Sequence, residues 1–276
     1  MAQFNYSIII PFRDSIGLLK KALNSIPDRS DIQVIIVDNS KILFKKEQYP
    51  IFNNAKLTLT SSTYGAGAGC ARNVGLKLVR GQWLIFLDAD DYFTNNAFDA
   101  FDNYLQTEYD IVFFKADSIN LVTGKESHRH IGINKQIDYF LSTKNEDFLR
   151  YQFSNPVCKM IRSSLVIEDN ILFEEIKCSN DSMFSVRSGH MASTITADKA
   201  SVYVITESPS GVSLTTDKSK ENSFIRFQVA TRRYAFLKSI GKGYLKPKFI
   251  SFIANALIKF GPYEALKYIK YYLVKK

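Results

Sequence analysis

Three carboxylates stand within four residues, at Asp88, Asp90 and Asp91, directly after an apolar run from Trp83 to Leu87. An unbroken apolar run of this length predicts a strand buried on both faces. Like charges this close repel one another unless a cation or several hydrogen-bond donors compensate them. Mg²⁺ and Mn²⁺ prefer carboxylate and phosphate oxygens, so the cluster is a candidate site for either ion. The alternative is a solvated acidic turn, with Asp91 capping a helix over residues 94–106.

A glycine-rich segment at residues 65–75 precedes this strand and favours the cation site. Its small residues would let the backbone and a bulky ligand approach closely. We expect Arg72 and Asn73 near the start of a helix that ends near Arg80, where backbone N–H groups favour anions. A glycine-rich loop, a helix, a buried strand and an acidic cluster, in this order, indicate a ligand site more strongly than the cluster alone.

Two further predicted strands end in polar residues. They cover residues 6–12 and 32–37, and a helix over 15–26 joins them. The intervening helix implies that the strands are parallel, and ligands of open α/β sheets bind at the carboxyl ends of such strands. Turn chemistry would explain each polar residue singly, but not all of them together. The residues expected at one edge of the sheet are Pro11, Arg13, Asp38 and Asp88.

Four segments resemble motifs of the family 2 glycosyltransferases, which have the GT-A fold. Those enzymes show an apolar strand ending in Pro, a strand ending in Asp-Asp-Gly-Ser, an Ala-Arg-Asn-x-Gly segment and Phe-Leu-Asp-x-Asp-Asp. The corresponding segments here are Ile8–Pro11, Val37–Ser40, Ala71–Gly75 and Phe86–Asp91, in the same order. The resemblance covers Ser7 to Asp91. It implies a Rossmann-like, mostly parallel α/β sheet flanked by helices that binds a nucleotide sugar, with UDP as the expected nucleotide.

The resemblance also implies roles in the first half of the chain. Asp90, together with Asp88, would hold Mn²⁺ or Mg²⁺, and Asp91 is a possible pocket residue. The backbone at Pro11 and the side chains of Asp38 and Arg72 would hold the base and ribose. The residues expected to bind the nucleotide sugar are Pro11, Arg13, Asp38, Arg72, Asp88 and Ala89.

A second set of matching residues lies further along the chain. Family 2 members commonly have a Lys after a helix break, an Ile-x-Phe-x-Glu segment and an Asn-Asp or Glu-Asp pair that opens a helix. Lys159, Ile171–Glu175 and the pair Asn180-Asp181 occupy these places. The resemblance makes Asp181 the general base, with Lys159 and Glu175 as possible pocket neighbours. As the alternative, Asp181 only caps the helix that begins there. Residues 207–213 look like the loop that closes over the donor in relatives.

Composition and local pattern argue against a zinc-binding protein and against a secreted one. Three cysteines without metal-site spacing and three histidines argue against a zinc site and fit a reducing cytosol. We expect no signal peptide, because a predicted strand begins almost at the first residue. For the stretch with His128 and His130, we favour an exposed strand over a metal site. These features together predict a cytoplasmic protein.

The net charge of +9 is placed unevenly. Residues 225–276 hold 12 Lys and Arg and one acid, a net +11, so the remainder carries −2. We predict helices over 219–240, 247–260 and 262–274, with Leu266, Ile269 and Leu273 on one face of the last. Either this face packs on the catalytic domain, or the tail rests on the anionic inner face of the membrane beside a lipid-linked acceptor. Without a recognisable nucleic-acid module, we expect no nucleic acid partner.

We therefore predict an α/β GT-A domain over residues 1–215 and a basic amphipathic helical region over 216–276. Residues 1–106 would bind the nucleotide sugar and 107–215 the acceptor. The expected activity is inverting transfer of a sugar to a hydroxyl of a glycan or lipid-linked acceptor, in cell-surface polysaccharide synthesis. One alternative is a sugar-phosphate nucleotidyltransferase, although Pro11–Ser15 lacks the glycine-rich first loop of such enzymes. Another is a non-catalytic adaptor on a membrane or nucleic acid.

Overall fold

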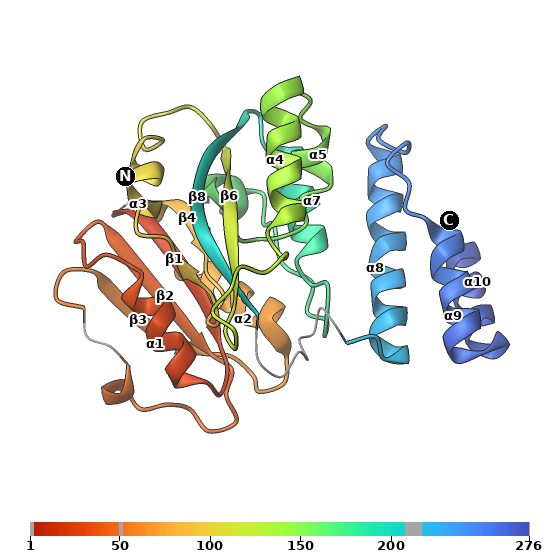
Figure 1. Cartoon of the computed structure of the whole chain (residues 1–276), viewed down its shortest axis with the longest axis horizontal. Coiled ribbons are helices and arrows are strands. Elements are labelled where there is room, and N and C mark those ends of the chain that lie inside the picture. The colour runs from red at the N-terminus through yellow and green to blue at the C-terminus, as the bar shows by residue number, and fades with distance from the viewer. Residues whose placement is uncertain (1–2, 50–51, 208–216, 276) are drawn as a thin grey trace.

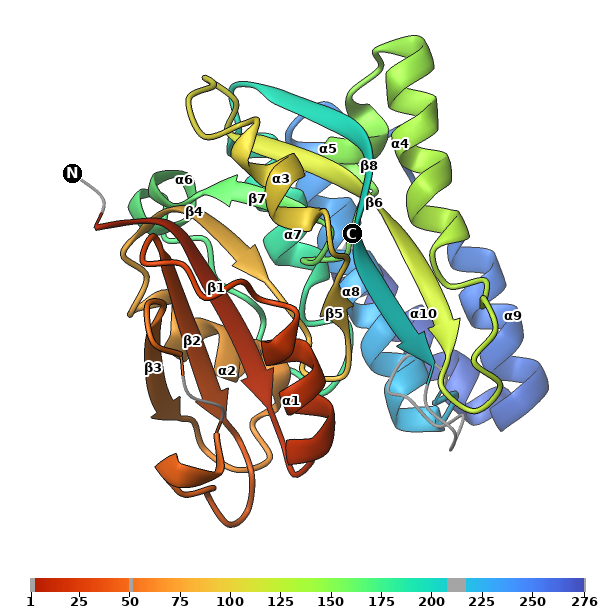
Figure 2. The same cartoon turned by 60° about the vertical axis from the view of Figure 1, so that its left-hand side comes forward.

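The computed structural model describes residues 3–49, 52–207 and 217–275. Within these ranges the strands form one curled sheet in the order β3-β2-β1-β4-β7-β6-β8-β5, with helices packed against it (Figures 1 and 2). The predicted fold class, a mostly parallel α/β sheet flanked by helices and followed by C-terminal helices, is confirmed.

The first half of the sheet is parallel, as its apolar runs predicted. β1 pairs in parallel with both β2 and β4, and β2 pairs with β3, so their carboxyl ends share one edge. Buried Ile and Val side chains fill β1 and β2, as expected for strands that are covered on both faces. The elements are β1 (Phe4–Phe12), α1 (Ile16–Asn24), β2 (Ile32–Asp38), η1 (Lys46–Gln48), β3 (Lys56–Ser61), α2 (Gly67–Leu76) and β4 (Gly81–Phe86).

The second half of the sheet mixes strand directions. β7 (Lys159–Arg162) runs antiparallel to β4 and to β6 (Ile111–Asn120), and β8 (Ile195–Glu207) runs parallel to β6. The sequence alone predicts two short strands, over residues 194–197 and 202–206, where the structure has the single strand β8. Register shifts beside Lys115 let β8 continue as one strand through its polar middle. The edge strand β5 (Tyr92–Phe93) pairs with β8 and thereby holds the chain after the acidic cluster against the end of β8.

Two predicted helices have different limits in the structure. α2 begins at Gly67, so Arg72 lies in the middle of the helix and not near its start. The helix predicted over 94–106 is the shorter α3 (Ala97–Asp102), which is flanked by Asn96 at its N-cap and Asn103 at its C-cap. The remaining helices of this region are α5 (Asp147–Tyr151), α6 (Ser163–Glu168) and α7 (Ser182–Met191).

The helix α4 (Ile131–Thr143) was not predicted. Its buried residues Ile133, Ile137 and Phe140 have helical spacing, and they pack it against β6 and β8. His128 and His130 lie in the turn that precedes α4, so the exposed strand predicted for them is wrong. The ring of His130 instead contacts the Ser118 hydroxyl at 2.7 Å.

The C-terminal helices form a unit beside the sheet (Figure 1). α8 packs on α7, with Leu237 in a cluster with Met183 and Val186. A second cluster, around Phe227 and Tyr268, joins α8 to α9 and α10. No helix in the described ranges combines the length and hydropathy needed to cross a membrane. The bounds are α8 (Lys220–Ser239), α9 (Phe249–Phe260) and α10 (Pro262–Lys275).

Candidate active site

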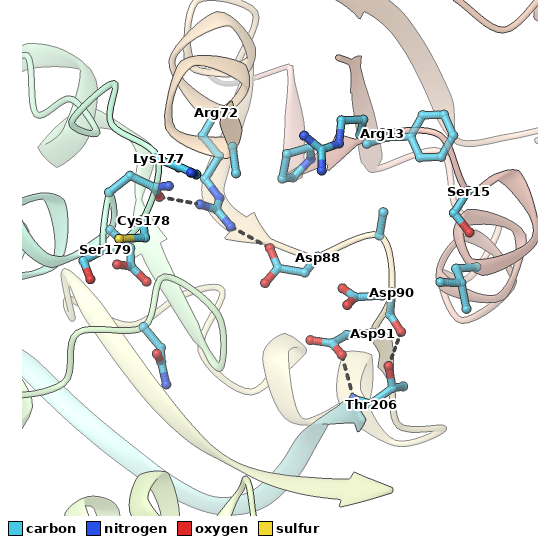
Figure 3. Close-up of a pocket in the computed structure, with 18 of the residues that line it drawn as sticks. Arg13, Ser15, Arg72, Asp88, Asp90, Asp91, Lys177, Cys178, Ser179 and Thr206 are labelled. Carbon is cyan, nitrogen blue, oxygen red and sulfur yellow. Dashed lines mark hydrogen bonds and ion pairs between the residues drawn. The ribbon is translucent and has the colours of Figure 1, made fainter. Parts of the chain in front are cut away.

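A cavity of about 820 Å³ opens at the carboxyl ends of β1 and β4 and reaches the start of α7 (Figure 3). Both halves of the sheet contribute to its walls, as expected for ligands of open α/β sheets. Eight of the predicted site residues line it: Pro11, Arg13, Arg72, Asp88, Ala89, Asp90, Asp91 and Asp181.

Arg72 links the acidic cluster to the start of α7. One terminal guanidinium nitrogen donates to Asp88 at 2.6 Å, and the other donates to the side-chain oxygen of Asn180 at 3.1 Å (Figure 3). The side chain is buried over the ring of Phe173, at 5.2 Å from its centroid. A buried, charge-assisted contact of this kind fixes the direction in which Asp88 points.

Asp90 is the carboxylate most open to the cavity. Its side chain is exposed, and no side chain or backbone group of another described residue forms a hydrogen bond or ion pair with the carboxylate. The cavity walls reduce its hydration and Asp88 adds negative charge, and both effects raise the pKa of Asp90. A neighbouring cation would reverse this effect, because it favours the charged carboxylate.

The donor set fits a hard cation that also binds phosphate. Asp88 and Asp90 supply carboxylate oxygens, which suit Mg²⁺ or Mn²⁺. No cluster of three or more His, Cys, Asp or Glu that could hold a metal occurs among the described residues. Two carboxylates are nevertheless the usual protein share of a Mg²⁺ site, because phosphate oxygens and water complete the coordination shell.

Asp91 differs from its two neighbours because its oxygens are already engaged. One accepts a hydrogen bond from the Tyr203 hydroxyl at 2.9 Å, and the other accepts from the Thr206 N–H at 2.7 Å. Burial and the charges of Asp90 and Asp88 raise its pKa well above the usual range. Asp91 does not cap α3, whose N-cap is Asn96, so the capping alternative is wrong.

Tyr203 and Thr206 are site residues that the sequence did not reveal. Both lie on β8, more than a hundred residues after the acidic cluster. The Tyr203 hydroxyl accepts from the Asp88 N–H at 3.1 Å, and the Thr206 hydroxyl donates to the Asp90 carbonyl at 2.7 Å. The end of β8 therefore fixes the backbone that carries the three carboxylates.

Asp181 is at the N-cap position of α7, but its side chain makes no capping hydrogen bond. The half-buried carboxylate lines the cavity instead. Burial raises its pKa, while the positive charge of Arg72 acts in the opposite direction. A carboxylate with a raised pKa and access to a cavity can accept a proton from a bound hydroxyl.

Lys159 and Glu175 do not line the cavity. Lys159 is buried, donates to the Ser185 hydroxyl at 3.2 Å and lies near the ring of Phe153, 5.4 Å from its centroid. Burial lowers its pKa to about 7, although Asp181 opposes the shift. Glu175 is exposed and accepts from the side-chain amide of Asn73 at 3.1 Å. Both residues therefore support the site from outside the cavity.

Asp38 also lies outside the cavity lining. Its carboxylate accepts from the backbone N–H groups of Ser40 and Phe44 at 2.9 and 3.0 Å, and from the Tyr49 hydroxyl at 2.9 Å. The side chain is buried. In this structure it organises the loop after β2, on the neighbouring strand to the one that carries Pro11.

Basic side chains from distant segments surround the carboxylates. Arg129 donates to the carbonyl of Thr206 at 2.8 Å, and Arg226 reaches the cavity from α8. Nothing in their local sequence distinguishes these residues from other surface cations. Positive charge gathered in a concave site attracts anionic ligands. The cations that line the cavity are Arg13, Arg72, Arg129, Lys177 and Arg226.

The glycine-rich helix α2 lies directly against the segment before α7. A Cβ built on Gly69 would overlap the carbonyl oxygen of Glu174, so no larger residue fits without a shift. Asn73 exchanges hydrogen bonds with the backbone of Phe173, at 2.9 and 3.0 Å. The absence of a side chain at Gly69 therefore lets α2 approach the backbone at Glu174, whereas the sequence suggested the approach of a bulky ligand. In the loop predicted to close over the donor, residues 208–213 lie outside those that the structure describes.

The chain is similar to glycosyltransferases named for poly(ribitol-phosphate). It is 26% identical over 215 residues to the poly(ribitol-phosphate) beta-N-acetylglucosaminyltransferase TarS of Staphylococcus aureus, covering 72% of this chain and 35% of TarS. It is 25% identical over 189 residues to a poly(ribitol-phosphate) beta-glucosyltransferase of Bacillus spizizenii, covering 65% and 28%. The chain thus spans about a third of the length of these curated relatives.

Solved structures share the fold. The crystal structure of S. aureus TarS 1-349 in complex with UDP-GlcNAc superposes with a TM-score of 0.70 at 19% identity, covering 97% of this chain and 79% of that one. The mannosyltransferase PcManGT from Pyrobaculum calidifontis, in complex with GDP-Man and Mn²⁺, gives 0.53 at 16% identity, covering 97% and 73%. The family model described as Glycosyl transferase family 2 matches residues 7–169, more than half of the chain. The chain therefore belongs to glycosyl transferase family 2 and has its GT-A fold.

Proposed function

We propose that this protein is an inverting glycosyltransferase of cell-surface glycan synthesis. It would move a sugar from a UDP-sugar to a hydroxyl of a glycan or lipid-linked acceptor. The observation that carries the proposal is one cavity lined by Asp88, Asp90 and Asp181, with Arg72 joining the two sides. Relatives named for transfer to poly(ribitol-phosphate), and a structural neighbour with bound UDP-GlcNAc, support this class of donor and acceptor.

The acidic cluster and the cations would hold the donor. Asp88 and Asp90 would bind Mn²⁺ or Mg²⁺, and such an ion, when bound, neutralises charge on a departing diphosphate. Arg72 fixes the Asp88 carboxylate, and Thr206 fixes the backbone of Asp90. Arg13 and Lys177 add positive charge to the same cavity. Holding these groups in place before the donor arrives lowers the free energy needed to organise the reaction.

Asp181 would act on the acceptor. Its carboxylate takes the proton from the acceptor hydroxyl, whose oxygen then bonds to the anomeric carbon as the bond to the diphosphate oxygen breaks. The raised pKa of Asp181 makes it a stronger base than an ordinary carboxylate. A single displacement with the base opposite the leaving group inverts the anomeric configuration.

A nucleotide-sugar panel tests the proposal against its two rivals. The full chain with Mn²⁺ should release UDP from a UDP-sugar, and Asp181→Asn should reduce transfer to an added hydroxyl acceptor. A nucleotidyltransferase would instead release pyrophosphate from UTP and a sugar 1-phosphate. An adaptor would do neither. Pyrophosphate release, or an absence of UDP release across the panel, would contradict the assignment.

We also propose a cytoplasmic location at the inner face of the membrane. The α9–α10 hairpin exposes several large apolar residues: Ile250, Leu257, Ile258, Tyr263, Leu266, Ile269, Leu273 and Val274. Exposed lysines, including Lys270 and Lys275, stand among them. Exposed apolar side chains that gather into a patch mark interaction sites, and we propose that these residues form one. The lysines favour an anionic lipid surface, and each can add about 1 kcal/mol of attraction there.

A further inference from the structure

A second cavity, of about 150 Å³, lies between α8, α9 and α10. Three cations line it: Lys218 before α8, Arg226 on α8 and Lys259 on α9. Phe252 and Phe260 supply apolar walls. No acidic residue belongs to the lining among the residues that the structure describes, so the lining itself carries a net positive charge.

Tyr268 adds a hydrogen-bond donor to this cavity. The residue is 2% exposed, and its hydroxyl is buried with no hydrogen-bond partner in the described part of the chain. Leaving such a group unpaired costs free energy, which an oxygen acceptor in the cavity would offset. The pKa of Tyr268 is raised by burial, so the hydroxyl keeps its proton and can donate.

Two acidic residues lie near the cavity without lining it: Asp217, directly before Lys218, and Glu264. Asp217 accepts a hydrogen bond from the side-chain amide of Asn222 at 2.6 Å. Glu264 is on the same helix as Tyr268 but does not line the cavity. Its carboxylate is paired with Lys220 at 2.6 Å and with Lys267 at 2.9 Å. Two cations on one carboxylate leave the neighbourhood with a surplus of positive charge.

Arg226 lines both this cavity and the catalytic cavity. A ligand held at the second cavity is therefore adjacent to the one that contains Asp181. Lys259 is about two and a half helical turns from Ile250, which places the two on opposite sides of α9. The second cavity therefore lies on the opposite side of α9 from Ile250, which is one of the exposed apolar residues of the hairpin.

We propose that the second cavity binds a phosphate group of the acceptor and so directs an acceptor hydroxyl toward Asp181. Three cations and one hydroxyl donor suit a phosphate, which has several oxygens that accept charge-assisted hydrogen bonds. The volume accommodates a single such group between the aromatic walls. The acceptor class is then a phosphate-bearing glycan or polyol. The proposed phosphate site does not itself depend on the transferase function. Only the identification of the phosphate-bearing ligand as the acceptor rests on that function.

Phosphate binding by the full chain tests this assignment. Dimethyl phosphate would be titrated and followed by ³¹P nuclear magnetic resonance, with UDP affinity measured separately by calorimetry. Lys259→Gln should weaken dimethyl phosphate binding about tenfold, and Tyr268→Phe should weaken it severalfold, because each removes a donor. The matched control Lys270→Gln removes an exposed lysine of α10 that does not line the cavity, and it should change nothing.

The outcomes separate this proposal from the proposed function and from a lipid site. UDP affinity should be unchanged in all three variants. Failure of the wild type to bind UDP would count against the transferase but not against the phosphate site. Dimethyl phosphate binding that is displaced by UDP and unaffected by Lys259→Gln would overturn the proposal. So would a dependence on Lys259 seen only with phosphatidylglycerol vesicles, because that result would indicate a lipid headgroup.

Discussion

Arg72 donates to Asp88 at 2.6 Å and, through its other terminal nitrogen, to Asn180, the residue directly before Asp181. One buried guanidinium therefore sets the spacing between the proposed metal ligands and the proposed base. A lysine could not replace it, because an ammonium group lacks the planar arrangement of donors that reaches both partners. Donor binding and proton transfer are thus expected to depend on the same side chain.

Asp90 is expected to be essential for metal-dependent donor binding. Asp90→Ala removes the carboxylate that is most open to the cavity and should leave the fold intact, since no other described residue bonds to this side chain. Calorimetry with Mn²⁺ and a UDP-sugar should show binding by the wild type and none by the variant. Asp169→Ala, at the exposed end of α6, is the control. Equal donor affinity in wild type and Asp90→Ala would remove Asp90 from the site.

Asp181→Asn is expected to lower transfer by roughly 10²-fold or more while donor affinity is kept. Asparagine has nearly the same shape and caps a helix as well as aspartate, so the start of α7 should be preserved. The variant therefore loses only the basic carboxylate at position 181. Steady-state transfer rates and UDP-sugar calorimetry give the two quantities. Near-normal turnover in this variant would limit Asp181 to a structural role.

The pH profile provides a further check on Asp181. Its pKa is raised from 3.8, so the protonated, inactive form should persist to a higher pH than for an ordinary aspartate. The rate of transfer should consequently fall, as the pH is lowered, at a pH above 3.8. Asp181→Asn should lose this acid limb. An acid limb that remains in the variant would belong to another group.

Lys159 is expected to make stability depend on pH above neutrality. Its pKa is about 7 in the fold and 10.5 ordinarily, so between these values the unfolded chain holds a proton that the folded chain has lost. The free energy of unfolding therefore rises with pH in this window. Lys159→Met removes that rise.

Urea unfolding at pH 6, 7, 8 and 9 would measure the effect, on the assumption that unfolding is two-state. The stability of the wild type relative to Lys159→Met should increase from about pH 7 upward and be constant below it. Lys135→Met, at an exposed position of α4, should keep the wild-type slope. Parallel curves for the wild type and Lys159→Met would show that the amine does not titrate in this range.

The α9–α10 hairpin is expected to bind anionic vesicles. Binding should require anionic lipid and weaken as salt rises, because screening shortens the range of the attraction. Lys270→Glu with Lys275→Glu should abolish it. The control pair Lys135→Glu with Lys199→Glu makes the same charge change at exposed positions outside the hairpin and should have little effect. Co-sedimentation that is equal with neutral and anionic vesicles would contradict the membrane proposal.

Local patterns in the sequence were enough to predict the parallel half of the fold. Apolar runs predicted β1, β2 and β4. The predicted helix between β1 and β2 implied that these strands are parallel. The position of Asp88 and Asp90 beside Pro11 followed from that direction, since all three lie at one edge of the sheet. The apolar runs are local in sequence, and the general rule that ligands bind at the carboxyl ends of parallel strands supplied the rest, although β1 and β4 themselves lie far apart in sequence.

The remaining parts depend on contacts far apart in sequence. Thr206 and Arg129 join the site only because β8 inserts between β6 and β5. Asp38 has suitable chemistry for a ligand, but the fold directs its carboxylate to Tyr49 and two backbone groups. The helix α4 was not predicted, because it follows a polar turn and its apolar residues are buried only through packing on β6 and β8.

The overlap that a Cβ at Gly69 would create with Glu174 has a genetic consequence. Gly69 is one turn before Arg72 on α2, so a single methyl group would act as a wedge that moves Arg72 away from Asp88 or from Asn180. Alanine is one nucleotide change away from glycine. Loss-of-function alleles should therefore arise at a position that carries no functional group, and second-site suppressors should map to the segment that bears Glu174.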